Sequence, residues 1–265
     1  MDASVHSNRP SDDSAGAEQF PARVSVIVAV YNAGATLQRC LESIIRQDHA
    51  DVEIVVIDGA STDGSVDIIR AHDAQIATWR SGPDDGIYDA WNKALEHVTG
   101  AWVCFLGADD EFAAPDSISK LIAAAQQDTD LVFGRVQLVD EQGTALRILG
   151  EPWNWSRMKR MPTVAHPGAL HKRTLFRRFG NFDQRYRIAG DYEFLLRVGA
   201  DAKASFLDDV VVRFANAGAS SSDARRRWAE NRDIHARHPE IGPRRAMVRH
   251  GVGLARVAVG RALGR

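Results

Sequence analysis

The sequence of 265 residues has little of what marks secreted, metal-cluster or membrane-spanning proteins. Its two cysteines, Cys40 and Cys104, form neither a metal-ligating spacing nor a disulfide framework, which is typical of a reducing cytosol. No apolar run is long enough to span a bilayer. The first twenty residues are polar and lack the apolar core of a secretory signal. We therefore expect a cytoplasmic protein with a disordered leader over residues 1–21.

Two common nucleotide-binding motifs are also missing. No G-x-G-x-x-G follows the first strand-like segment, residues 24–30, which argues against a dinucleotide-dependent dehydrogenase. No G-x-x-x-x-G-K-[ST] occurs either, which excludes a P-loop enzyme. A nucleotide bound by this chain must therefore be held in another way.

The net charge is −2, but the charges are unevenly distributed along the chain. From Arg225 to the C-terminus there are eleven arginines and three acidic residues, so this tail carries about +8 and the remainder about −10. A membrane surface or a phosphate-bearing substrate would suit the tail, and a solvated helix face explains it equally well. Apolar residues between the last arginines fit an interfacial helix, although three glycines weaken the helix prediction. We expect no nucleic-acid partner.

The first half of the chain alternates strand-like and helix-like segments. Short β-branched apolar runs predict buried strands, and apolar residues three and four apart predict amphipathic helices. This order predicts a parallel sheet with helices on both faces. The predicted strands are 24–30, 52–57, 75–79 and 101–106, and the predicted helices are 36–47, 65–71 and 86–98.

The pattern changes after Pro115. Longer strand-like runs and short helices replace the regular alternation, and no linker divides the chain, so both halves are expected to share one core. We place one domain over residues 22–215 and a basic helical extension over 216–265. The predicted helices are 117–125, 174–179, 192–198 and 221–236, and the predicted strands are 131–139, 145–149 and 203–214, with a hairpin turn at 141–143.

Unusual polar residues follow three of the predicted strands. Tyr31, Asp58 and the pair Asp109–Asp110 stand at carboxyl ends, where open α/β sheets bind ligands. Tyr31 could stack on a nucleobase, and Asp58 could accept from a base N–H or a ribose hydroxyl. Adjacent carboxylates are costly at a buried strand end, whereas Mg²⁺ carrying phosphates needs one or two of them. The alternative is that the pair ends the strand and caps the following helix.

Three segments in this order resemble family 2 glycosyltransferases of the GT-A fold. They are Val24–Asn32, Val56–Gly64 and Ala108–Asp110, and the resemblance extends over about residues 23–214. It implies a mainly parallel, Rossmann-like sheet flanked by helices, with a C-terminal acceptor-side region. It also implies a nucleoside-diphosphate sugar donor, Mn²⁺ or Mg²⁺ as cofactor, and a glycan or lipid-linked acceptor, which would bring the enzyme to the inner membrane face.

The segment Gly82–Ala94 is similar to a subgroup that builds bacterial surface polysaccharides and glycolipids. This resemblance places Asp85 and Gly86 near the base and ribose of the donor. It places Asn92 and Lys93 near the sugar and phosphates. For these last two residues, an exposed helix face is the alternative interpretation.

The segment Arg187–Arg197 matches the part of the family that carries the general base, and Asp191 takes that position. An inverting transfer needs one carboxylate to accept the proton of the attacking hydroxyl. An N-cap on the following helix is the alternative. His166 also lies in a matching segment, and it binds the acceptor or the diphosphate or else serves as a structural histidine. Pro167 stands where the family usually has Gln.

Two positions depart from the family pattern. Ala29 replaces a frequent Thr or Ser, which removes a side-chain contact to the base. Gly107 replaces the first acid of the usual Asp-x-Asp, which leaves Asp109 for ribose or metal and Asp110 for metal.

The sequence therefore predicts a metal-dependent, inverting glycosyltransferase. One alternative is a nucleotidyltransferase, which would normally carry a basic, Gly-rich loop where this chain has Ala33-Gly34-Ala35. The other is a non-catalytic nucleotide-sugar-binding relative, which predicts loss of an acidic set that is present here in full.

Overall fold

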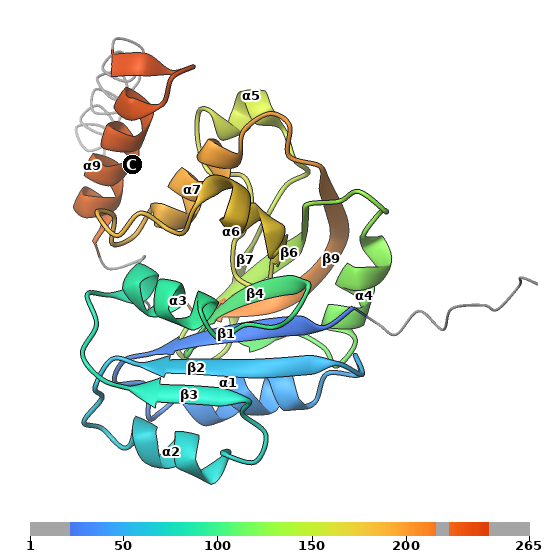
Figure 1. Ribbon diagram of the computed structural model, residues 1–265, viewed down its shortest axis with the longest axis vertical. Coiled ribbons are helices and arrows are strands. Elements are labelled where there is room, and N and C mark those ends of the chain that lie inside the picture. The colour runs from blue at the N-terminus through green and yellow to red at the C-terminus, as the bar shows by residue number, and fades with distance from the viewer. Residues whose placement is uncertain (1–21, 216–222, 244–265) are drawn as a thin grey trace, which may run out of the picture.

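The computed structural model describes residues 22–215 and 223–243 (Figure 1). The predicted leader, residues 216–222 and the last arginines of the basic tail lie outside these described residues. No helix in the described ranges has the length and apolar character needed to cross a bilayer.

The first half of the chain alternates strands and helices, as predicted. The strands are buried runs rich in Val and Ile, which suit a sheet covered on both faces. Leu37, Cys40, Leu41 and Ile44 line one face of the first helix at the predicted spacing. The elements are β1 (Val24–Val30), α1 (Leu37–Ile45), β2 (Val52–Asp58), α2 (Ser65–Ala71), β3 (Thr78–Ser81), α3 (Ile87–Leu95) and β4 (Trp102–Gly107).

The second half begins with a two-residue strand and ends with a long polar helix. The side chain of Asp223 accepts a hydrogen bond from the backbone N–H of Arg226 at the start of that last helix, which is the role of an N-cap. The elements are β5 (Glu111–Phe112), α4 (Ser117–Ala124), β6 (Leu131–Val139), β7 (Ala145–Leu149), α5 (Trp155–Met158), β8 (Leu170–Lys172), α6 (Thr174–Phe179), α7 (Gly190–Val198), β9 (Ala204–Ala215) and α9 (Ala224–Arg237).

All described strands join one sheet, in the order β3-β2-β1-β4-β8-β6-β9-β5, with β7 paired to β6. The strands β3, β2, β1 and β4 are parallel neighbours, so this half of the sheet is the Rossmann-like part. The other half is mixed, because β8 runs antiparallel between β4 and β6 while β9 is parallel to β6. The prediction of a mainly parallel GT-A sheet flanked by helices is confirmed.

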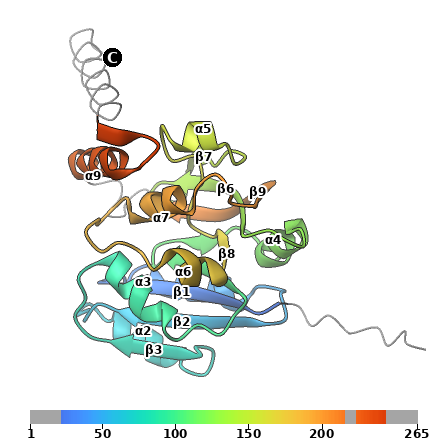
Figure 2. The ribbon, with the colours of Figure 1, turned by 45° about the horizontal axis from the view of Figure 1, so that its top comes forward.

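Each face of the sheet has its own core, because side chains alternate along the strands. In β4, Phe105 faces the side covered by α3, α6, α7 and α9, whereas Cys104 and Leu106 face α1 and α4. Both cores draw residues from both halves of the chain, as expected for one continuous core. Figure 2 shows α9 beside α7, at the end of the molecule away from β1, β2 and β3.

Some element boundaries differ from the predictions. β3 begins at Thr78 and not at Gln75, because residues 72–75 form turns that close α2. The strands β5 and β8 were not predicted, since two or three residues carry no periodicity that could be recognised. Both cysteines are free and buried, in agreement with the prediction of no disulfide.

Candidate active site

The carboxyl ends of the parallel strands lie in one row. In the strand register Val30 pairs with Asp58, Asp58 with Ser81, and Ala29 with Gly107. The polar residues predicted from three separate segments therefore gather at one edge of the sheet. This edge is where ligands bind in open α/β folds.

Asp58 is fully buried, and its partners fix one of its two carboxylate oxygens. Oδ2 accepts from the Ser61 backbone N–H at 3.1 Å and from the Ser81 hydroxyl at 2.6 Å. Oδ1 is equally buried and has no hydrogen-bond partner within the described residues. A buried carboxylate oxygen without a donor is costly, so a ligand N–H or hydroxyl would complete this site. Tyr31, at the end of the neighbouring strand, is 70% exposed and offers an open ring face.

Two loops beyond these strands are tied to each other by side chains. The Asn32 backbone N–H donates to Ser61 Oγ at 2.8 Å, and Asn32 Oδ1 accepts from the Thr62 N–H at 2.9 Å. The Gly34 N–H donates to Asp63 Oδ2 at 2.8 Å. These bonds make the rim around Tyr31 and Asp58 a preorganised surface.

Residues 82–86, the loop predicted to contact the donor and called the donor loop below, fold over this rim. Asp84 reaches Gly59, since a Cβ built there would lie 2.6 Å from Asp84 Oδ2. The exposed Asp85 carboxylate lies 4.0 Å from the Arg187 guanidinium, and a Cβ on Gly86 would lie 2.7 Å from Arg187 Nη1. A loop near residue 85 thus meets a loop near residue 187, which the sequence separates by about one hundred positions.

Asp109 and Asp110 have different environments. Asp110 is 2% exposed, and its oxygens accept from the Gly107 N–H at 3.1 Å and the Ala215 N–H at 3.0 Å. Asp109 is partly buried, and its carboxylate accepts from no other residue in the described ranges. Burial raises the pKa of Asp109, and burial with the neighbouring charge of Asp109 raises the pKa of Asp110 well above its usual range.

Gly107 leaves room for this pair to fold back over the strand end. A Cβ at Gly107 would lie 2.7 Å from Asp110 Oδ2 and 2.8 Å from Asp109 Oδ1. Glycine at position 107 therefore allows both carboxylates to lie close to the backbone of the strand end.

The predicted donor-contacting residues of α3 are already bonded within the protein. Asn92 donates to the Phe182 carbonyl at 2.9 Å and accepts from the Phe182 N–H at 3.0 Å. Lys93 binds Asp89 at 2.8 Å and the Pro83 carbonyl at 3.0 Å. In this structure Asn92 supports the loop at Phe182, and Lys93 supports the donor loop through Pro83.

Asp191 lies in the first turn of α7 and meets α3. Tyr88 Oη donates to Asp191 Oδ1 at 3.0 Å and lies 2.8 Å from the Ile188 carbonyl oxygen. Burial raises the pKa of Asp191, and the Tyr88 hydrogen bond opposes this rise. Tyr88 directly follows the donor loop, so it connects the predicted donor side with the predicted base.

His166 is buried at 4% exposure and lies between aromatic rings. Its ring stacks on Trp91 and Phe105 and lies 4.9 Å, centroid to centroid, from His171. Burial lowers its pKa to about 3, so His166 is neutral at physiological pH. Its Nε2 has no partner within the described residues. Direct contact with an acceptor or diphosphate would need rearrangement of this cluster.

Sequence reasoning assigned no role to three residues that the structure places at the site. Tyr88 lies inside the segment 82–94, and Arg187 begins the segment 187–197. Both segments carry the family resemblance, which could therefore have indicated these two residues. Glu230 of α9 binds the loop before Asp191, and no local pattern indicates it.

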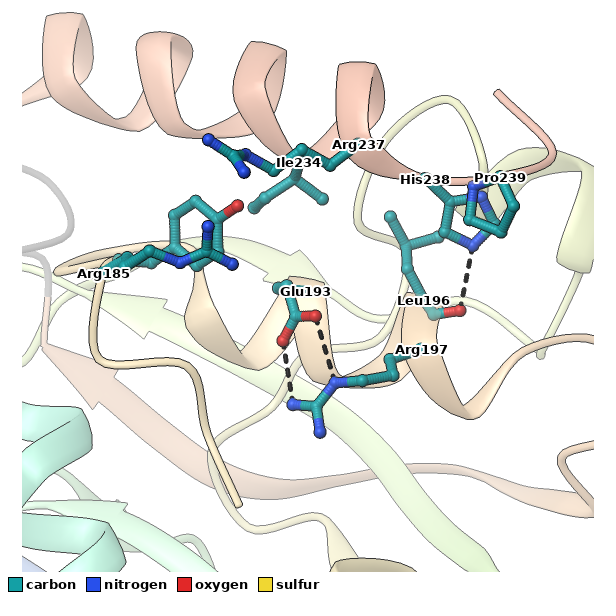
Figure 3. A pocket seen from close by; sticks show the side chains of 9 residues that line it. Arg185, Glu193, Leu196, Arg197, Ile234, Arg237, His238 and Pro239 are labelled. Carbon is teal, nitrogen blue, oxygen red and sulfur yellow. Dashed lines mark hydrogen bonds and ion pairs between the residues drawn. The ribbon is translucent and has the colours of Figure 1, made fainter. Parts of the chain in front are cut away.

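A separate cavity of about 280 Å³ lies between α7 and α9 (Figure 3). Leu196 and Ile234 line it together with Arg185, Arg197 and Arg237. Each of these arginines pairs with a carboxylate two or four positions away in the chain. Its lining residues do not include Asp191, so this cavity is distinct from the candidate active site.

The sheet, its flanking helices and the residues at its carboxyl edge define a glycosyltransferase of the GT-A fold. More particularly, the chain belongs to glycosyl transferase family 2, whose family model matches residues 25–182. The predicted family and enzyme class are confirmed. The match ends before α7, so it covers the strand ends and the donor loop but neither Asp191 nor α9.

Several curated relatives are similar over much of the chain. A PGL/p-HBAD biosynthesis glycosyltransferase of Mycobacterium bovis is 33% identical over 178 residues, which cover 65% of this chain and 68% of the relative. A glycosyltransferase of uncharacterized activity from Mycobacterium tuberculosis is 30% identical over 237 residues, covering 83% and 87% of the two chains. Succinoglycan biosynthesis protein ExoO of Rhizobium meliloti is 27% identical, covering 60% of this chain and 45% of ExoO.

Solved structures share the fold at low identity. Mannosyltransferase PcManGT from Pyrobaculum calidifontis, in complex with GDP-Man and Mn²⁺, superposes with a TM-score of 0.64 at 23% identity, covering 91% of this chain and 76% of PcManGT. TarS of S. aureus gives a TM-score of 0.63 at 19% identity, covering 81% of this chain and 39% of TarS. Residues 1–349 of TarS, in complex with UDP-GlcNAc, also give 0.63.

Proposed function

We propose that this enzyme transfers a sugar from a nucleoside diphosphate to a hydroxyl of a glycan or glycolipid, with inversion at the anomeric carbon. The observation that carries the proposal is the Tyr88–Asp191 hydrogen bond, which joins the first turn of α3, just after the predicted donor loop, to the predicted base. Relatives named for PGL/p-HBAD and succinoglycan biosynthesis support a glycolipid or polysaccharide acceptor.

The donor site would be built from the strand ends. Asp58 Oδ1, buried and without a partner in the described ranges, would accept from the base or ribose. Tyr31 would stack on the base, and Asp85 and Gly86 would close over it. Asn92 and Lys93 would act by supporting this loop and its neighbour, in line with their present bonds. The neighbours that contain GDP-Man and UDP-GlcNAc support a nucleotide-sugar donor.

The carboxylates at the end of β4 fit a divalent cation. The two carboxylate oxygens of Asp109 accept no hydrogen bond from another described residue. Because Asp109 is partly buried, its negative charge is costly without a cation. Asp110 would orient the turn and add one oxygen. Within the described residues no group of three or more His, Cys, Asp or Glu side chains could hold a metal alone, so the diphosphate would supply further ligands. Mn²⁺ or Mg²⁺ bound here would neutralise the leaving diphosphate.

Asp191 would take the proton from the attacking hydroxyl. Its raised pKa brings it closer to the range of an effective general base, and the Tyr88 hydrogen bond keeps it oriented. Water exclusion would come from the donor loop and Arg187, which meet at Gly86.

Contact with the inner membrane face stays a prediction for the basic tail. The six arginines that follow Pro239 would carry most of this contact, and Arg225, Arg227 and Arg232, which α9 exposes, would add to it. Cosedimentation with anionic liposomes tests it: a chain truncated after Pro239 should lose binding, and equal binding would contradict the prediction.

A panel of UDP-, GDP- and dTDP-sugars tests the donor site by thermal shift. We expect one nucleotide class to raise the unfolding temperature in the presence of Mn²⁺, because a ligand that binds only the folded state stabilises it. EDTA should remove most of this rise. If no member of the panel stabilises the protein with Mn²⁺, the proposed donor site is wrong.

A further inference from the structure

Helix α9 contacts the loop that precedes the proposed base. Figure 3 shows α9 running over α7, with Ile234 directed towards α7. One turn earlier in α9, Glu230 is buried at 8% exposure and points into the loop 187–189. This contact lies outside the region that the family model matches, residues 25–182.

Glu230 accepts three consecutive backbone hydrogen bonds. Its Oε1 accepts from the Arg187 N–H, and its Oε2 accepts from the N–H groups of Ile188 and Ala189, each at 2.9 Å. Carboxylates that accept several backbone N–H groups are strongly fixed, because each charge-assisted bond is stronger than a neutral one. The bonds hold a loop that ends two residues before Asp191.

One of these bonds brings an acceptor to the N-cap residue of α7. Ala189 is the N-cap residue of α7, and no side chain of its own segment caps the helix. The first N–H groups of a helix need acceptors from outside the helix. Glu230, about forty residues later in the chain, accepts from the N–H of this N-cap residue and places a negative charge near the start of α7, where the helix dipole favours one.

Neighbouring contacts hold both sides of this loop. The Ile188 carbonyl lies 2.8 Å from Tyr88 Oη, the same hydroxyl that binds Asp191. Tyr186 Oη donates to Asp233 of α9 at 2.9 Å. The backbone before Asp191 is therefore held by α3 through its carbonyl and by α9 through its N–H groups.

We propose that Glu230 is a positioning residue for sugar transfer, which holds residues 187–189 from α9 so that Asp191 keeps its place against Tyr88 and Arg187 keeps its place against Gly86. The inference rests on the proposed function, because it assigns the loop to the base and the donor. It makes α9 part of the catalytic unit and not an appendage of it.

Charge gives the proposal a second consequence. Glu230 raises the pKa of Asp191 in addition to the larger effect of burial, whereas Tyr88 on α3 lowers it. Arg226 pairs with Glu230 at 3.1 Å and offsets part of its charge. Arg187, in the loop between them, directs its guanidinium to Gly86 and Asp85. Removing the charge of Glu230 should therefore lower the pKa of Asp191.

Two variants of Glu230 separate geometry from charge. Glu230→Gln removes the charge and one acceptor, and Glu230→Asp keeps the charge but shortens the side chain. Glu193→Gln is the matched control, because Glu193 on α7 is also partly buried and paired with an arginine four positions away, yet binds no loop backbone. The measurement uses the nucleotide sugar that stabilises the protein in the thermal-shift panel. The rate at which the enzyme releases its nucleoside diphosphate, with Mn²⁺ present, is measured across pH.

We expect Glu230→Gln to lower kcat about ten- to a hundred-fold, because a small displacement of a catalytic group has effects of this size. The acidic limb of its pH profile should move to lower pH. Glu230→Asp should lower kcat without moving that limb, and Glu193→Gln should resemble the wild type. A folded Glu230→Gln variant with wild-type kcat and an unmoved limb would overturn the proposal.

Hydrogen exchange tests the same contact without any substrate. The amides of Ile188 and Ala189 should exchange slowly in the wild-type full chain and faster in both Glu230 variants. Equal exchange would overturn the positioning role even if the enzyme transfers sugar. Faster exchange would support that role even if no nucleotide sugar of the panel stabilises the protein. The positioning role of Glu230 and the proposed donor site are therefore tested independently.

Discussion

Single residues connect the two sides of the site, and Tyr88 and Gly190 do so most closely. A Cβ on Gly190 would lie 2.8 Å from Tyr88 Cε2, so only glycine lets the Tyr88 ring pack directly on the start of α7. That packing brings the Tyr88 hydroxyl to Asp191. The position of Asp191, the proposed base, therefore depends on the absence of a side chain one position before it.

Replacing Tyr88 should change the pH dependence of transfer. The Tyr88 hydrogen bond lowers the pKa of Asp191, so Tyr88→Phe should raise that pKa and leave less carboxylate at a given acidic pH. The acidic limb of the kcat profile should move to higher pH, opposite to the effect expected for Glu230→Gln. Tyr31→Phe, which removes a hydroxyl from an exposed ring, should leave the limb in place. A limb that stays or falls in Tyr88→Phe argues against Asp191 as the base.

The sequence identified residue types better than it identified their partners. Asp58 and Asp109 could be chosen because they follow predicted strands, whose carboxyl ends bind ligands in open α/β sheets. Asp191 could be chosen from the family resemblance. The bonds of Asn92 to Phe182 and the burial of His166 depend on segments distant in sequence. No local pattern reports such contacts.

At the scale of elements, the turn after β4 is tied to the end of β9 through Asp110. Its two oxygens accept from Gly107 within the turn and from Ala215 in the distant strand. Asp109, next to it, makes no comparable bond within the described residues. Two adjacent side chains of the same type thus differ in their bonds: both Asp110 oxygens are bonded within the protein, whereas the Asp109 carboxylate accepts no bond from another described residue.

This division predicts opposite effects for two alanine variants. Asp110→Ala should lower the free energy of unfolding by about 1–3 kcal/mol, because buried N–H groups lose their acceptor. Asp109→Ala should unfold like the wild type in urea but lose the Mn²⁺-dependent part of donor stabilisation. Urea titration and thermal shift measure the two effects. Full Mn²⁺-dependent stabilisation of Asp109→Ala would show that the metal is held elsewhere.

Helices and long strands could be predicted from periodicity, whereas pairing could not. The segments that became β1, β6, α2 and α6 kept their predicted bounds, because their apolar spacing is unambiguous. The two-residue β5 exists only because it pairs with β9, a hundred residues later. Its formation is a tertiary effect that local composition does not encode.

At the scale of the molecule, the order of the strands determines the site. The parallel half supplies Tyr31, Asp58 and Asp109 at one edge, as the alternating pattern predicted. The insertion of β8 between β4 and β6, and the return of β9 to the sheet, bring the C-terminal half against the same core. This connection places the start of α7 against Tyr88 and α9 against the loop before α7. The strand pairing behind it could not be predicted from the sequence.

The Asp191→Asn variant shows whether Asp191 is the base of a sugar-transfer reaction. Asparagine keeps the shape of the side chain but cannot accept the proton. With the stabilising donor and Mn²⁺, the variant should show the wild-type thermal shift, while nucleoside diphosphate release falls about a hundred-fold or more, the usual share of a general base. Wild-type release by a folded Asp191→Asn variant would contradict the account.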